Sequence, residues 1–266
     1  MSLRIGAALQ EGFSRTFRRN GLVLVAVFVL FGLANAVVSQ SFTAAQTALM
    51  ADGFGQMPGG QPGGAPGVGE LVPGVGSGDP TPLALPIPLP VAGLLALAFA
   101  FVAEGLRIVS IRVFASDETA VVPGELVRRN IGVAVLNGVV AGIIVTIAVV
   151  LGLIALILPG IFLAVSFFFI RQAIAVEDEN FMGALSRSWE LTKGNRFGLL
   201  GLAIIVWVIN LIVGIPTAGF LFLNPLAGTL LSVVISGFTT VFGIAVATRA
   251  FEQVRRGQAD PVDTSM

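Results

Sequence analysis

The chain has 266 residues, of which 55% are hydrophobic and only 11% are charged, and its mean hydropathy is +0.94. Soluble domains carry about 25% charged residues, so this composition excludes an ordinary soluble protein and indicates lipid as the main solvent. Cysteine, histidine and tyrosine are absent and the formal net charge is zero. Disulfides, thiol catalysis, imidazole metal ligands and a conventional catalytic triad are therefore excluded.

Long apolar runs predict an all-α membrane protein. A helix that crosses the hydrocarbon core needs about 20 mostly apolar residues. The sequence predicts six such spans, at residues 21–38, 91–109, 133–158, 161–176, 197–215 and 226–247. Pro159 and Gly160 separate the third span from the fourth, and we expect a tight turn there because proline interrupts a helix. Arg171 lies in the short fourth span, and we expect its long side chain to reach the headgroups.

The first span has a second interpretation. Residues 15–36 combine a basic flank, an apolar core and an Ala34-Asn35-Ala36 ending, which is the pattern of a secretory signal peptide. Cleavage would release five further spans without a folded exported domain. We therefore favour a membrane anchor.

The basic residues predict the orientation of the spans. They fall before the first span, around the second-to-third and fourth-to-fifth connections and after the sixth span, which places all of them on one side of the membrane. They are Arg4, Arg15, Arg18, Arg19, Arg107, Arg112, Arg128, Arg129, Arg171, Arg187, Lys193, Arg196, Arg249, Arg255 and Arg256. Since basic loops stay in the cytoplasm, we expect a prokaryotic cell-membrane protein with both termini cytoplasmic.

One long connection, residues 51–82, contains eleven glycines and six prolines. Such a segment buries too little apolar surface to offset the entropy of ordering, so we expect a flexible extracytoplasmic loop. A phosphate-cradling glycine loop is the weaker alternative, because no Gly-Lys-Ser/Thr follows. We expect residues 257–266 to be a disordered tail, and residues 1–266 to form a single transmembrane domain.

Short amphipathic helices precede several spans. Residues 181–193 repeat apolar residues at helical spacing, with a tryptophan suited to the membrane interface. Similar patterns at residues 5–18 and 124–136 predict three hairpins, each preceded by a cytoplasmic interfacial helix. The residues that we expect to contact lipid or a partner are Arg15, Arg18, Arg19, Arg187, Trp189, Lys193 and Arg196. The acids at 177–179 are expected to be solvated and favoured by the helix dipole, rather than to bind a divalent cation.

Residues 159–206 resemble a known family. Pro159-Gly160, then Glu177, then the Ala184–Asn195 segment ALSRSWELTKGN are similar to the polytopic membrane domain associated with glycerophosphoryl diester phosphodiesterases, and to related uncharacterised prokaryotic families, including haloarchaeal ones. The resemblance implies a membrane domain without known chemistry. The phosphodiesterase domain of such proteins is a separate soluble barrel, which this sequence does not resemble.

Polar residues inside the spans are candidates for function, because ionisable groups in lipid are costly. Glu104, Arg107, Asn137 and Asn210 are such residues. We expect Glu104 and Arg107 to pair within one helix, the two asparagines to bond between helices, and Gly138 and Gly142 to allow close helix packing.

Together these features predict a membrane protein without cofactor, metal or nucleic acid, which binds anionic lipids or a cytoplasmic protein and has no catalytic site. The first alternative is a small-solute or lipid transporter in which the four polar residues converge. A membrane-embedded phosphodiester hydrolase is the least favoured, because the acids are scattered.

Overall fold

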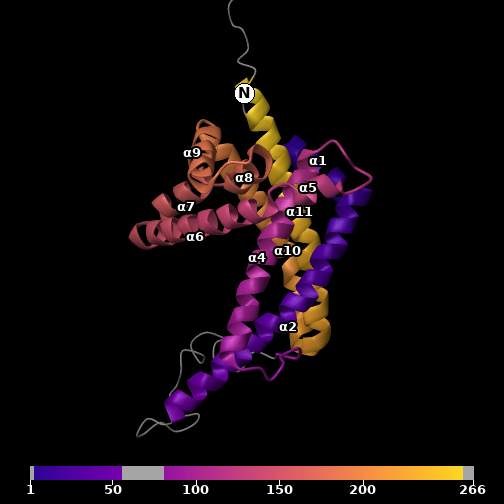
Figure 1. The fold of residues 1–266 in the computed structure, drawn as a ribbon, viewed down its shortest axis with the longest axis vertical. Coiled ribbons are helices and arrows are strands. Elements are labelled where there is room, and N and C mark those ends of the chain that lie inside the picture. Colours follow the sequence, from indigo (N-terminus) through magenta and orange to yellow (C-terminus); the bar gives the residue numbers. More distant parts are fainter. Residues whose placement is uncertain (1–2, 56–80, 260–266) are drawn as a thin grey trace, which may run out of the picture. The chain divides into compact units, whose positions relative to one another are not determined.

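The computed structural model describes residues 3–55 and 81–259. Every regular element in these residues is an α-helix, which confirms the predicted all-α class (Figure 1). The helices are α1 (Ile5–Thr16), α2 (Arg19–Gly55), α4 (Leu89–Ala115), α5 (Gly124–Arg128), α6 (Ile131–Ala155), α7 (Ile157–Ser166), α8 (Ile170–Glu177), α9 (Phe181–Thr192), α10 (Arg196–Leu223) and α11 (Pro225–Ala259).

Six helical stretches of the described residues are long and apolar enough to cross a membrane, so the chain is a multi-pass membrane protein. They are Arg19–Met50, Leu89–Ala115, Ile131–Ala155, Ile157–Glu177, Arg196–Leu221 and Pro225–Gln258. The first five residues of the predicted loop are helical, because α2 continues to Gly55. Likewise α11 continues to Ala259. The rest of the predicted tail, and residues 56–80 of the loop, lie outside the described residues.

Two prolines that the predicted spans leave in connections lie inside helices. The chain reverses at Leu156, which is extended (φ −162°, ψ 137°), and Pro159 sits in the first turn of α7. A proline fits there because the first N–H groups of a helix have no helical partner. Similarly, α10 continues through Pro216 to Leu223. Asn224 then caps α11 by accepting a hydrogen bond from the Ala227 N–H.

The fourth span is broken between α7 and α8. The Phe169 N–H donates to the hydroxyl of Ser188 (3.1 Å), and this hydroxyl donates to the Ser166 carbonyl (3.0 Å). Thr192, one turn further along α9, also lies 3.2 Å from the Ser166 carbonyl. The hydroxyls of α9 therefore satisfy backbone groups that a continuous helix would pair internally, which is a recognised cause of helix breaks.

The described residues fall into two compact units, 3–29 with 101–213 and 236–259, and 30–55 with 81–100 and 214–235. The core of the first unit joins α1, α7, α9, α10 and α11, and it includes the fully buried Phe169 and Phe251, whose rings pack edge to face. In the second unit, Phe31 and Phe99 stack at 5.4 Å between ring centres. Gln40 there accepts a hydrogen bond from the Leu83 N–H (2.8 Å).

The three segments with similar amphipathic patterns, at residues 5–18, 124–136 and 181–193, each begin with a short helix that a long helix follows directly. These pairs are α1 and α2, α5 and α6, and α9 and α10. An asparagine stands at or next to the start of each long helix. Asn20 donates to the Glu118 carbonyl, and Asn195 accepts from the Leu3 N–H. Asn130 adopts a left-handed conformation (φ 44°), which asparagine tolerates better than most residues.

Candidate functional site

An ion-pair cluster lies inside the predicted spans. Glu104 on α4 is 4% exposed, and its carboxylate accepts hydrogen bonds from Arg171 Nε on α8 (2.8 Å) and Arg107 Nη1 (3.4 Å). The predicted pair between Glu104 and Arg107 is confirmed. Arg171 also has this partner inside the protein, which the sequence does not predict.

Two glycines of α6 make room for this cluster. A Cβ at Gly138 would lie 2.7 Å from Glu104 Oε1, and one at Gly142 would lie 3.4 Å from Arg171 Nη2. Gly138 and Gly142 therefore have a second role besides the close helix packing that the sequence predicts. They accommodate the charged side chains that join α4 to α8.

The two intramembrane asparagines behave differently. Asn137 accepts a hydrogen bond from the Phe181 N–H at the start of α9 (3.0 Å), as expected for a residue that bonds between helices. Asn210 donates to the Val206 carbonyl of its own helix (2.8 Å), and it forms none of the expected interhelical bonds with residues 3–55 or 81–259.

A cavity of about 560 Å³ adjoins the cluster. Arg107, Arg171 and Asn210 line it, together with Gln172 and Trp207. Asn137 lines a separate cavity of about 50 Å³ beside Asp178. Of the four predicted intramembrane residues, Arg107 and Asn210 therefore share a cavity, Glu104 is bonded to Arg107, and Asn137 lies apart.

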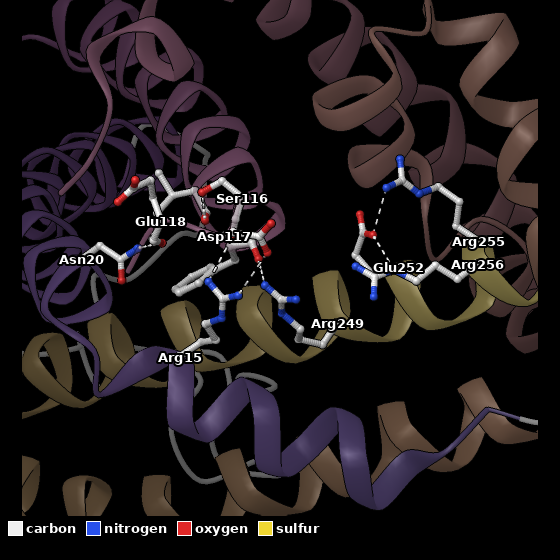
Figure 2. A network of polar contacts seen from close by, with 11 residues as sticks. Arg15, Asn20, Ser116, Asp117, Glu118, Arg249, Glu252, Arg255 and Arg256 are labelled. Carbon is white, nitrogen blue, oxygen red and sulfur yellow. Dashed lines mark hydrogen bonds and ion pairs between the residues drawn. The ribbon is translucent and has the colours of Figure 1, made fainter. Parts of the chain in front are cut away.

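Two arginines from different helices cap the end of α4 (Figure 2). Arg15 donates to the Ser116 carbonyl (2.9 Å), and Arg249 on α11 donates to the Phe114 carbonyl. The last carbonyls of a helix have no helical partner and carry partial negative charge, which favours cations there. Arg15, which the sequence assigns to lipid or a partner, thus has an internal acceptor. Further along α11, Glu252 pairs with Arg255 and Arg256 (Figure 2).

Two of the three acids at 177–179 are paired with arginines, so the expectation that these acids are solvated is wrong for Glu177 and Asp178. Arg187 on α9 forms two hydrogen bonds with the Glu177 carboxylate (2.8 and 3.2 Å). This hydrogen bonding raises the pKa of Arg187 above its ordinary value, so the side chain stays charged. Asp178 pairs with Arg112 (3.4 Å) and with Arg129 (3.2 Å).

Arg196 lies against two aromatic rings that also contact each other. Its guanidinium carbon lies 4.4 Å from the centre of the Phe162 ring and 4.5 Å from the centre of the Trp189 ring. Both distances are within the range of cation–π attraction. Arg196 and Arg187 thus have partners within the protein, whereas the side chains of Arg18, Arg19 and Lys193 are exposed.

The sequence matches the family described as "Domain of unknown function (DUF7847)" over residues 3–254. The chain belongs to the DUF7847 family. Comparisons with curated proteins and with solved structures returned no match.

In this DUF7847 protein, Arg112 is a buried polar residue that the sequence does not predict to be part of the site. It is 2% exposed, and it donates to the carbonyls of Ala175 (2.9 Å), Leu126 (3.2 Å) and Arg129 (2.6 Å). The guanidinium thereby joins α4, α5 and the end of α8. Its position near the end of an apolar span resembles that of an ordinary flanking arginine, so sequence alone gives no signal for this role.

The ALSRSWELTKGN segment of the DUF7847 chain has a structural role at several positions. Ala184, Ser188, Leu191 and Thr192 are fully buried. Gly194 takes a left-handed conformation (φ 87°) just after α9, as glycines at helix ends do. Asn180 begins α9 by accepting a hydrogen bond from the Gly183 N–H.

Proposed function

We propose that this protein is a non-catalytic multi-pass protein of a prokaryotic cell membrane whose basic face binds anionic lipid headgroups. In this proposal α1, α5 and α9 lie at the cytoplasmic interface, each leading into a transmembrane hairpin, and both termini are cytoplasmic. We also propose that the protein is related to the membrane domain associated with glycerophosphoryl diester phosphodiesterases, which its sequence resembles.

The observation that carries the proposal is the closeness in sequence of exposed cations and exposed aromatic side chains. Arg18 and Arg19 follow Phe13 and Phe17, which are 57% and 48% exposed. The exposed Lys193 directly follows the last residue of α9, and Trp189 near the end of that helix is 38% exposed. Aromatic rings favour the membrane interface, and basic residues beside them attract anionic lipid by about 1 kcal/mol each.

Three of the arginines that the sequence assigns to lipid binding have partners within the protein, which leaves fewer residues free to bind headgroups. Arg15, Arg187 and Arg196 contact acceptors or rings of the protein, so their charges are partly used in folding. Arg18, Arg19 and Lys193 are therefore the residues on which we expect headgroup binding to depend most. A cytoplasmic protein with an acidic surface is the alternative occupant of the same face.

Tryptophan fluorescence offers a direct test, because the chain has only two tryptophans and no tyrosine. The Trp207→Phe variant leaves Trp189 as the single reporter beside Lys193. In nanodiscs of phosphatidylcholine, we expect brominated phosphatidylglycerol to quench Trp189 more than brominated phosphatidylcholine does. Lys193→Gln should lower this preference about fivefold, whereas Lys193→Arg should keep it. Equal quenching by the two lipids would reject lipid binding at α9.

A transporter is the second candidate, and the cavity beside Arg107 and Asn210 favours it. Transport requires that this cavity opens alternately to the two sides of the membrane. Single cysteines at Asn210 and Thr240 would test this in the cysteine-free chain. Labelling of either from both sides by a water-soluble maleimide would favour transport, and labelling from one side alone would count against it.

A further inference from the structure

The 560 Å³ cavity beside the ion-pair cluster has the size of a ligand site, since such sites span about 300–1,000 Å³. All of its lining residues belong to one compact unit, and they come from α4, α8, α10 and α11 and from the break before α8. Because Arg18, Arg19 and Lys193 are not among them, an inference about this cavity does not rest on the proposed function.

The charge in this cavity is unbalanced. Arg107 and Arg171 both line it, and their side chains are 44% and 43% exposed. Within residues 3–55 and 81–259, Glu104 is the only acid that pairs with either arginine. Two guanidinium groups against one carboxylate leave one positive charge in excess. Because an uncompensated charge inside a bilayer is costly, the cavity favours a ligand with a single negative charge.

The cavity also contains a buried polar group that lacks a hydrogen-bond donor. Gln172 lines the cavity and is 5% exposed, and its side-chain Oε1 has no hydrogen-bond partner among the described residues. A buried amide oxygen without a donor costs about 1–3 kcal/mol. A ligand that carries both a negative charge and an O–H or N–H group would satisfy the arginines and Gln172 together.

The remaining walls and the depth of the cavity fit an amphiphile. Ile111, Phe168 and Leu202 provide apolar surface. Arg107 lies eight residues before the end of α4, which is about 12 Å along the helix at 1.5 Å per residue. The interfacial layer is roughly 5–8 Å thick on each side of the hydrocarbon core, so the long arginine side chains can meet a headgroup at its inner boundary.

We propose that this cavity binds a monoanionic oxyanion, such as the phosphodiester of a lipid headgroup or dihydrogen phosphate. Arg107 and Arg171 hold the anion by charge-assisted hydrogen bonds, Gln172 accepts a hydrogen bond from its hydroxyl or amine, and the apolar walls contact a hydrocarbon portion where one is present. Glu104 holds Arg171 in place and limits the excess charge to one.

Trp207, which lines the cavity, is the reporter for the test. The Trp189→Phe variant leaves it as the only tryptophan, so the cavity is measured separately from α9. In phosphatidylcholine nanodiscs we expect brominated phosphatidylglycerol to quench Trp207 more than brominated phosphatidylcholine does. A saturable change of Trp207 fluorescence on adding inorganic phosphate, without a lipid preference, would support the same site with a water-soluble anion as its ligand.

Two variants with opposite effects on charge separate binding from damage to the fold. Arg107→Gln removes the excess charge while Glu104 keeps its 2.8 Å bond to Arg171, and we expect it to weaken the preference for the anion about fivefold. Glu104→Gln raises the excess charge, and we expect it to strengthen that preference. A purely structural role would move both variants in the same direction. Arg128→Gln, an exposed residue of α5 outside the cavity, is the control and should change nothing.

Three results would overturn the proposal. The first is equal quenching of Trp207 by both lipids together with no response to phosphate. The second is an anion preference that Arg107→Gln leaves unchanged. The third is the same shift for Glu104→Gln and Arg107→Gln. Loss of the lipid preference at Trp189 alone would reject the proposed function and leave this site intact.

Discussion

The carboxylate of Glu104 occupies the space that a side chain at Gly138 would fill. A Cβ at position 138 would lie 2.7 Å from Glu104 Oε1 and 3.1 Å from its Cγ. The charged pair between α4 and α8 therefore depends on a third helix, α6, having a glycine at position 138.

Gly138→Ala should consequently destabilise the protein. We expect a loss of about 1–3 kcal/mol, the usual cost of overpacking, measured by thermal unfolding in detergent with circular dichroism. Gly132→Ala is the matched control, because it lies on the same helix and its Cβ would meet nothing within 4 Å. It should be neutral or stabilising by up to about 1 kcal/mol. Equal stability of the two variants would contradict this account of Gly138.

Ser188→Ala should weaken the broken span. The substitution leaves the buried Phe169 N–H without its acceptor, and an unsatisfied buried group costs about 1–3 kcal/mol. Unfolding in a graded series of denaturing detergent would measure the loss. Ser186→Ala makes the same change at an exposed site of α9 and should shift stability by no more than about 0.5 kcal/mol. A comparable loss in both variants would mean that the hydroxyl at 188 has no special role.

Arg112→Lys should be strongly destabilising although the charge is kept. One ammonium group cannot reach the carbonyls of Ala175, Leu126 and Arg129 together in the forked geometry of a guanidinium. We expect a loss of about 2–4 kcal/mol, since at least one carbonyl loses its donor. Arg128→Lys, at an exposed position, provides the comparison and should be near neutral. A small effect at 112 would show that water or lysine replaces the lost bonds.

The proposed orientation can be tested by labelling, because the chain contains no cysteine. Ser77→Cys should react with a membrane-impermeant maleimide on intact cells. Ser265→Cys should react only after the cells are permeabilised. The opposite pattern would place the basic face outside, and the same reactivity at both positions would refute the predicted topology.

The spans could be predicted because membrane helices depend on local composition. Apolar runs of sufficient length identify six helices, and the spacing of Glu104 and Arg107 was enough to predict their pair. Tertiary contacts could not be predicted in this way. The partner of Glu104 that matters most, Arg171, is 67 residues away in the chain, and no local pattern relates the two.

Helix faces and turns were predicted less well, for a physical reason. In lipid, small and hydroxyl-bearing residues pack helices together while large apolar residues can face the bilayer. Helical periodicity in α9 therefore locates Trp189 but does not indicate that Ser188 and Thr192 form the protein-facing side. Likewise Pro159 suggests a turn and the predicted fifth span ends before Pro216, yet both prolines lie inside helices, because a first turn or a membrane helix tolerates the missing N–H.

The broken span has a consequence for the order of synthesis. The ribosome makes α7 and α8 before α9, so the Phe169 N–H and the Ser166 carbonyl enter the membrane before Ser188 exists to bond them. Neither α7 nor α8, of ten and eight residues, is long enough to span the bilayer alone. Residues 157–188 are thus the shortest nascent segment in which both of these backbone groups have a partner, and a chain released before Ser188 would carry an incomplete span.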